Sequence, residues 1–132
     1  MKELDRIREQ FAKDRYATET TGIEITEVGE NFARVELELD ERHYNALGNV
    51  MGGVLFTMAD FAFAVATNSG DESCVTLGSH ISFLRSTRGK HLTAVAECVK
   101  KGRSTRFYQV KVVDEFGKVI AQAATDGYIL DE

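Results

Sequence analysis

One segment constrains the fold of this chain more than any other. Residues 53–69, GVLFTMADFAFAVATNS, are rich in alanine and apolar on almost every side. A helix without a polar face has to be buried, because no side of it can meet water at low cost. Asn68, Ser69 and Gly70 predict its end, with glycine suited to a left-handed residue after the last turn. We therefore expect a long helix at the centre of the fold.

Shorter patterns before this helix indicate a second helix and two strands. Apolar residues recur at helical spacing over residues 4–11, which predicts a short amphipathic N-terminal helix. Apolar and charged residues alternate over 23–25 and again over 33–39, as in strands with one wet face. A turn at 27–31 would join these two strands.

Four strand-like runs follow the apolar helix. Tight turns at 101–103 and 115–117 join the last three runs and predict that these pair as an antiparallel meander. The four runs are 74–84, 91–101, 104–114 and 119–130.

These elements predict an α+β fold, with an antiparallel five- or six-stranded sheet wrapped around a central buried helix. The 132 residues suit a single domain, 1–132. One sheet of this size covers only one side of a helix that is apolar all round. We therefore expect a second copy of the chain to cover part of the remaining apolar surface.

Composition limits the class of partner and the compartment. Sixteen lysines and arginines against 21 acidic residues give a net charge of −5, which argues against binding nucleic acid or an acidic membrane. The longest apolar run, 54–67, is too short to cross a bilayer and has Asp60 near its centre. The two cysteines have no C-x-x-C spacing, and the charged N-terminus is unlike a secretory leader. We expect a soluble, cytoplasmic protein.

Asp60 lies about two turns into the apolar helix. An ionised carboxylate in such surroundings costs several kcal/mol unless it is paired or hydrogen-bonded. No lysine or arginine lies within the helix to pair with it. A carboxylate neutralised in the core is the structural interpretation, and a functional carboxylate is the one that we favour.

Gly52 and Gly53 open the same helix. Backbone N–H groups at a helix start are unpaired donors that can stabilise a developing oxyanion, although a double glycine is also typical of a tight turn. The rotational offset between this helix start and Asp60 suggests that the two serve one site from different subunits. Asn45 and Asn49, in the preceding loop, either form turns or position water.

The loop and the helix together carry a motif. The residues HYNALGNVMGG at 43–53, with Asp60 seven residues later, resemble the signature of PaaI-type hotdog-fold acyl-CoA thioesterases. TLGSHISFLR at 76–85 resembles the family's strand after the central helix, and GKVIAQAATDGYI at 117–129 agrees with it near the C-terminus. The resemblance covers nearly the whole chain. It implies a hotdog fold and an active site built from two chains of a homodimer or homotetramer.

The resemblance also implies roles for individual residues. Asp60 matches the family's catalytic carboxylate, which acts as nucleophile or as general base for water. Gly52 matches the glycine whose backbone N–H polarises the thioester carbonyl. Asn45 matches the asparagine that orients water or substrate, and Thr76 matches a Ser/Thr that assists from the neighbouring subunit.

Met51 departs from the family pattern, which often has histidine at this position. A thioether cannot replace the hydrogen bond that histidine provides, so rate and substrate preference are open. Together with Gly53, Met51 is expected to lie against the substrate. Thioester hydrolysis needs a polarising donor and a carboxylate near water, and neither a metal nor a cofactor beyond the coenzyme A of the substrate.

Basic residues are concentrated in one part of the chain. Residues 85–111 hold eight basic residues and one acidic residue, a local charge of +7 that leaves −12 for the remainder. The diphosphate and 3′-phosphate of coenzyme A suit such a cluster, whereas a solvated strand edge is the alternative. Arg85 and Arg103, followed by Lys101, are the candidates for phosphate contacts.

The histidines and cysteines give weaker signals. His43, His80 and His91 share no metal-ligand spacing. Cys74 and Cys98 lie in apolar strand-like runs and are expected to be small core residues.

We therefore expect a thioesterase that hydrolyses acyl-CoA to a free acid and coenzyme A. Three rivals remain: a hotdog protein that binds acyl-CoA or an acyl carrier without hydrolysis, a hotdog hydratase or dehydratase, and a dimerisation module with a vestigial site. Met51 favours the first, and the lack of a clear histidine partner for Asp60 disfavours the second. The acyl group stays open, because Phe56, Phe61, Phe63 and Phe83 either line a pocket or belong to the core.

Overall fold

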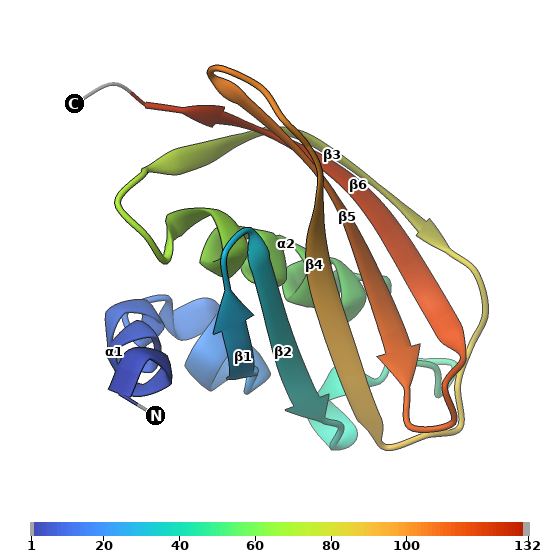
Figure 1. Cartoon of the computed structure of the whole chain (residues 1–132). Helices are drawn as coiled ribbons and strands as arrows, with labels where there is room; N and C mark the ends of the chain where they lie inside the picture. The colour runs from blue at the N-terminus through green and yellow to red at the C-terminus, as the bar shows by residue number, and fades with distance from the viewer. Residues whose placement is uncertain (1, 131–132) are drawn as a thin grey trace.

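The computed structural model describes residues 2–130. Its helical elements are α1 (Lys2–Phe11), the π-helical turn η1 (Tyr16–Thr21), the 3₁₀ turn η2 (Glu41–His43) and α2 (Gly52–Asn68). Its strands are β1 (Glu24–Gly29), β2 (Phe32–Glu38), β3 (Cys74–Phe83), β4 (His91–Lys101), β5 (Thr105–Asp114) and β6 (Val119–Ile129). Figure 1 shows the sheet curving around α2, with α1 beside β1.

The six strands form one antiparallel sheet in the order β1-β2-β4-β5-β6-β3. The predicted meander is confirmed, because β4, β5 and β6 pair in sequence. β3 crosses to the far edge and pairs with β6, so that Thr76 lies opposite Gly127 and Ser79 opposite Thr125. The turn between β1 and β2 is shorter than predicted. It consists of Glu30 and the left-handed Asn31, with a φ of 57°.

The core lies between the concave face of the sheet and α2. Side chains alternate between buried and exposed along β2, β5 and most of β4 and β6, as a sheet with one wet face requires. From α2, Met58, Phe63 and Val65 are completely or almost completely buried, and the Phe63 ring meets Tyr108 edge-on with centroids 5.2 Å apart. Burial of this apolar surface, at roughly 25 cal/mol per Å², is the main force that holds helix and sheet together.

The end of α2 differs from the sequence prediction. Gly70 does not adopt the left-handed conformation, and the residue after the helix, Ser69, keeps a right-handed helical backbone. The side chain of Asn68 closes the helix instead. Its amide nitrogen donates to the carbonyls of Ala64 and Cys74, and its oxygen accepts from the Cys74 N–H at 2.7 Å. Because Asn68 links the helix end directly to β3, the turn does not need a left-handed glycine.

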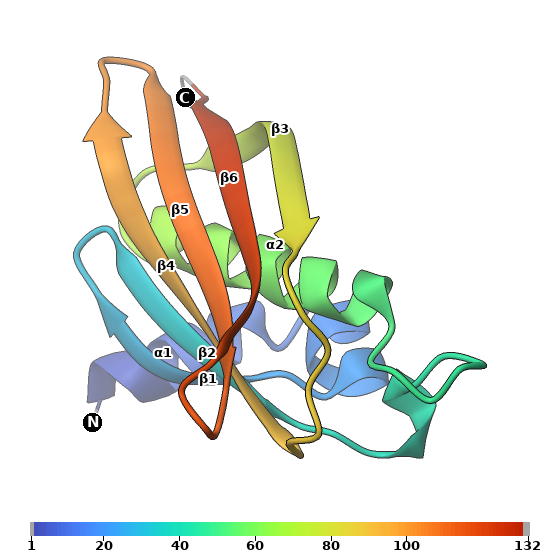
Figure 2. The same ribbon diagram turned by 90° about the vertical axis from the view of Figure 1, so that its right-hand side faces the viewer.

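The sequence of α2 suggested a helix that is buried on every side, but one side of α2 is open in the structure. The sheet covers one side, and the other side, which includes Gly53 and Asp60, is open. The strand nearest to this open side is β3, whose outer edge is free and which is exposed on both faces over most of its length (Figure 2). No helix among residues 2–130 is long and apolar enough to cross a bilayer.

Candidate active site

The open side of α2 forms one wall of a cleft of about 750 Å³. The second wall is the segment from Asp14 to Ala17, which leads from α1 into η1, and Ser79 of β3 borders the cleft as well. We call this space the α2 cleft. Its lining residues are Asp14, Arg15, Tyr16, Ala17, Gly53, Phe56, Thr57, Asp60, Phe61, Ala64 and Ser79.

Asp60 projects from α2 into this cleft. The side chain is exposed in the single chain, so the alternative of a carboxylate neutralised in the core is wrong. Residues 53, 56, 57, 60 and 64 recur at helical spacing, which puts Asp60 on the one face of α2 that no strand covers. Among the described residues, no hydrogen bond or ion pair engages its carboxylate. Partial burial raises the pKa of Asp60, and the negative charge of Asp14 raises it further.

Gly52 and Gly53 offer unpaired backbone donors at the start of α2. Met51 is the N-cap residue and supplies no side-chain cap, so neither glycine N–H has an acceptor among the described residues. Gly53 borders the α2 cleft, and a Cβ there would meet no atom within 4 Å. Gly52 faces a different space, where a Cβ would lie 3.0 Å from the Phe83 ring.

That second space is a hollow of about 340 Å³ between the start of α2 and the residues that follow β3. We call it the Phe83 hollow. It brings together Gly52, Asn49 and Arg85, three residues that the sequence singled out. The single chain therefore groups Asp60 with Gly53 in one space, and Gly52 with Arg85 in the other.

The loop before α2 uses Asn45 to hold its own shape. The side-chain oxygen of Asn45 accepts hydrogen bonds from the N–H groups of Leu47 and Asn49, each at 3.0 Å. Its N–H also donates to the Asn49 carbonyl at 2.8 Å, next to a bridge between Tyr44 and Val50. The turn-forming interpretation of Asn45 is thus realised, and Asn45 does not border the α2 cleft in the single chain.

His43 connects this loop to the N-terminal wall of the cleft. The ring is 2% exposed, accepts from the Asp40 N–H at Nδ1 and lies 2.7 Å from the Thr21 carbonyl at Nε2. Nε2 must therefore carry the proton. The main-chain carbonyl of His43 accepts from Met51 N–H at 2.9 Å, directly before α2.

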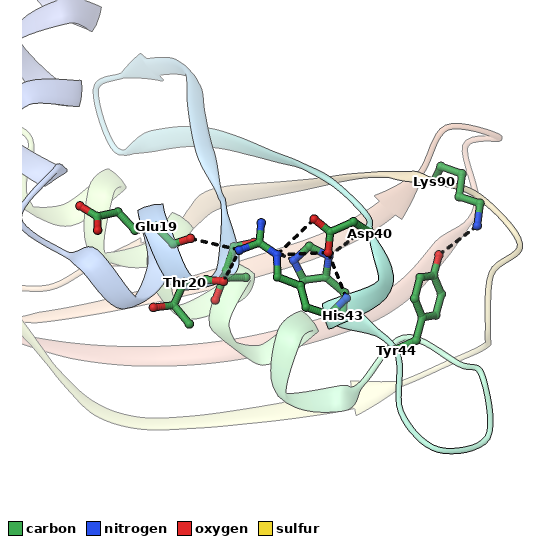
Figure 3. Close-up of polar contacts among 8 residues, drawn as sticks. Glu19, Thr20, Asp40, His43, Tyr44 and Lys90 are labelled. Carbon is green, nitrogen blue, oxygen red and sulfur yellow. Dashed lines mark hydrogen bonds and ion pairs between the residues drawn. The ribbon is translucent and has the colours of Figure 1, made fainter.

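Arg42 strengthens the same connection. It pairs with Asp40 and donates to the carbonyls of Glu19 and Thr20 (Figure 3). His43 and Arg42 together fix η1 against the entry to α2. His43 is therefore a structural residue of the loop motif.

Thr76 lies on β3, on the face of the sheet that looks toward α2. Its pairing with Gly127, whose neighbours on the same face of β6 are buried, fixes this orientation. The residue is exposed and does not line the α2 cleft in the single chain. Ser79, on the same face, does line it and shares a 2.8 Å hydrogen bond with the buried hydroxyl of Thr125.

The basic residues of 85–111 do not form one cluster. Arg85 borders the Phe83 hollow, whereas Lys101 borders a hollow near the opposite end of α2, next to the β4–β5 turn that contains Arg103. Arg106 is 3% exposed; it donates to both carboxylate oxygens of Glu72 at 2.8 Å and to the Gly102 carbonyl. Arg106 is therefore a structural cation.

The aromatic residues divide between pocket and core. Phe56 and Phe61 line the α2 cleft, Phe63 belongs to the core, and Phe83 is exposed beside Gly52. Met51 is 53% exposed and marks the start of α2. No group of three or more potential metal-ligating side chains gathers among residues 2–130.

Sequence reasoning missed the N-terminal wall of the α2 cleft. Asp14, Arg15 and Tyr16 lie in a polar segment without helical or strand periodicity, and no local pattern connects it with α2. Ser79 could have been found from the sequence, because it lies in the motif segment 76–85. It is two residues before the apolar, half-buried Ile81, so the two side chains lie on the same face of the strand.

The fold and the overall sequence of the chain are similar to those of known proteins. The family described as the thioesterase superfamily matches residues 47–121 of this chain. The acyl-coenzyme A thioesterase PaaI of Escherichia coli is 36% identical over 101 residues, which cover 76% of this chain and 72% of that protein. A 1,4-dihydroxy-2-naphthoyl-CoA hydrolase of Listeria monocytogenes is 32% identical over 77% of this chain and 85% of its own length.

The solved structure of E. coli PaaI superposes with a TM-score of 0.84 at 29% identity, over 97% of this chain and 96% of that one. The predicted hotdog fold is thereby confirmed. The chain belongs to the thioesterase superfamily and is a PaaI-like member of it.

Proposed function

We propose that this chain hydrolyses acyl-CoA thioesters to a free acid and coenzyme A. The observation that carries the proposal is Asp60, a carboxylate that has no partner among the described residues and lies in a mostly apolar cleft. The helix that carries Asp60 begins with backbone N–H groups that are unpaired. Two relatives of this family are named for hydrolysis of CoA thioesters, which supports the same reaction here. Asp60 serves as general base for water or as nucleophile toward the thioester carbon.

In the general-base form, Asp60 takes a proton from water as the water oxygen attacks the carbonyl carbon. The Gly52 N–H donates to the carbonyl oxygen as its negative charge grows. The C–S bond then breaks, coenzyme A leaves as the thiolate, and the proton from Asp60 passes to the sulfur. Asn45 and Thr76 hold the water or the substrate.

The proposed site needs two chains. Gly52 and Asp60 are eight residues apart on α2, so about 12 Å of helix rise separates them, and they open into different spaces. One carbonyl cannot contact both residues of the same chain. We therefore assign Gly52 to one subunit and Asp60 to its partner.

The free edge of β3 supports such a pairing. Val75 and Leu77 are exposed on this strand, and an unpaired apolar edge is suited to pairing with another strand. A second copy along β3 would bring its own Thr76 and helix start toward the open side of α2. The minimum unit in this proposal is a homodimer, and a homotetramer is a dimer of such dimers.

Coenzyme A would cross from one chain to the other. Arg85, which lines the Phe83 hollow with Gly52, is one candidate for contact with its phosphates, and Arg103 and Lys101 are candidates at the opposite end of the sheet. Gly53 and Met51, next to the reacting centre, would contact the substrate. Both cysteines are free thiols, which suits the cytoplasm as the proposed location.

Binding of acyl-CoA without turnover is the second candidate function. Met51 favours it, because a thioether at the helix start cannot donate a hydrogen bond to the thioester.

The test measures release of free thiol from a panel of aliphatic and aromatic acyl-CoA esters, with equilibrium binding of the same esters measured in parallel. We expect turnover of at least one ester. Tight binding of esters with no turnover of any would replace hydrolysis by the binding function.

A further inference from the structure

Asp14 is an exposed residue that lines the α2 cleft on the wall opposite Asp60. It lies between α1 and η1, and its main chain has a clear structural role. Its N–H donates to the Phe11 carbonyl, and its own carbonyl accepts from both the N–H and the hydroxyl of Thr18, all at 3.0 Å. The carboxylate has no hydrogen bond or ion pair among residues 2–130. The fold therefore uses the backbone of Asp14 and leaves its charge to the cleft.

The charges that border the cleft are not balanced. Arg15 is the cation among its lining residues, and its guanidinium is paired with Glu19 at 3.0 Å. The hydroxyl of Ser79 is bonded to Thr125. Asp14 and Asp60 therefore give the cleft a net negative charge. Asp14 also raises the pKa of Asp60, which places the two carboxylates within electrostatic reach of each other.

Apart from Thr57, whose hydroxyl donates to the Gly53 carbonyl at 2.7 Å, the rest of the lining is apolar or aromatic. Phe56, Phe61 and Ala64 from α2 face Tyr16 and Ala17 from the N-terminal segment. Such a surface holds a hydrocarbon chain or a ring by burying its apolar area. A carboxylate on the far end of that group would meet Asp14 with no free cation to offset the repulsion.

We propose that Asp14 is a specificity residue of the acyl site: it admits acyl groups that are uncharged or that end in a hydrogen-bond donor such as a hydroxyl, and it rejects acyl groups that carry a terminal carboxylate. This proposal rests on the proposed function, because it takes the α2 cleft as the place where the acyl group binds. It names the substrate class that the cleft selects.

The test compares two esters that differ in one charged group, hexanoyl-CoA and adipoyl-CoA. For the wild-type protein we expect kcat/KM for hexanoyl-CoA to exceed that for adipoyl-CoA by about 100-fold, as two nearby carboxylates would produce. Asp14→Asn should reduce this ratio about tenfold, chiefly through a higher kcat/KM for adipoyl-CoA. Part of the preference should persist, because Asp60 is still present.

Two controls separate selection from a general structural effect. Asp71→Asn removes one negative charge from an exposed residue beyond the C-terminal end of α2 and should leave the ratio unchanged. Asp14→Ser, which also removes the charge, should repeat the effect of Asp14→Asn. A damaged fold would lower both activities together and leave their ratio unchanged.

Binding distinguishes failure of this proposal from failure of the proposed function. The dissociation constants of two thioether analogues, S-hexyl-CoA and S-(5-carboxypentyl)-CoA, are measured by calorimetry and need no turnover. An inactive protein that binds the hexyl analogue at least tenfold more tightly than the carboxypentyl analogue, with a clearly smaller preference in Asp14→Asn, would contradict hydrolysis and support the role of Asp14. Equal affinity of the wild-type protein for both analogues, or a preference that Asp14→Asn leaves intact, would overturn the role of Asp14.

Discussion

Gly52 and Asp60 lie on the same helix but face two different spaces. Gly52 packs against the ring of Phe83 in the hollow that also contains Arg85, whereas Asp60 faces the cleft bordered by Ser79 and the N-terminal segment. This separation underlies the proposed two-chain site.

Substitution of Gly53 by alanine is expected to change the stability of the fold and the activity in opposite directions. A Cβ at this position meets no atom within 4 Å in the single chain, and alanine favours a helix more than glycine does. We expect Gly53→Ala to raise the free energy of unfolding by about 0.5 kcal/mol, measured by urea denaturation. Activity should nevertheless fall at least tenfold, because the methyl group enters the space beside Asp60 where substrate binds. Full activity in this variant would show that substrate does not approach Gly53.

Arg85 and Arg103 are expected to affect substrate binding. Changing either to glutamine should raise KM for an acyl-CoA about three- to tenfold with little change in kcat, because the phosphates of coenzyme A do not change in the reaction and their contacts stabilise the bound substrate and the transition state equally. The increase should shrink as salt is added. Lys118→Gln, in the β5–β6 turn outside 85–111, is the matched control. An unchanged KM in both arginine variants would make these residues part of a solvated edge.

The contacts of His91 predict that part of the folding stability depends on pH. Its ring contacts Glu38 through Nδ1 and Glu36 through Nε2, the latter at 2.6 Å, and these hydrogen bonds raise the pKa of His91. A raised pKa means that the folded chain holds the proton more tightly than the unfolded chain does. The resulting stabilisation is complete below the histidine pKa of the unfolded chain, about 6.5, and is lost as pH rises through the folded value.

The measurement compares melting temperatures of the wild-type protein and His91→Gln at pH 6 and pH 9. The variant should melt several degrees below wild type at pH 6, and the gap should narrow at pH 9. A gap that is constant over this range would mean that the two glutamates do not stabilise the charged ring.

The raised pKa of Asp60 also predicts the pH at which kcat/KM falls on the acidic side. Its raised pKa means that the ionised, active form is lost at a higher pH than for an ordinary aspartate, as pH falls. The midpoint of kcat/KM against pH should lie above 3.9, the value of an exposed aspartate, and Asp14→Asn should move it downward. A midpoint at or below the ordinary value would contradict the partly buried environment of Asp60.

Periodicity and turn residues were sufficient to predict most elements of the fold. Local sequence patterns predicted three parts of the fold that the structure contains: α2, the N-terminal helix, and the meander of β4, β5 and β6. The position of β3 beside β6 was not predictable in this way. Pairing between strands that are distant in sequence depends on the packing of the whole sheet, which no short window of sequence records.

Only those residues of the candidate site that belong to the motif could be predicted from the sequence. Asp60 was identified from its contrast with apolar neighbours, but that same contrast suggested burial in the core. The structure leaves it on an open face, because one sheet covers one side of a helix. Asp14 carries no local signal, since its part in the cleft arises from the packing of η1 against α2.

The most direct test of the proposed function is kcat for hydrolysis of a good acyl-CoA substrate by Asp60→Asn. The variant should fold, and its melting temperature at neutral pH should equal or exceed that of wild type. The reason is that ionised Asp60, with its raised pKa, is less favourable in the folded chain than in the unfolded one. We predict that kcat falls by at least about 100-fold, because asparagine can neither accept a proton from water nor attack the thioester. A kcat within about threefold of wild type would contradict the role of Asp60 in catalysis.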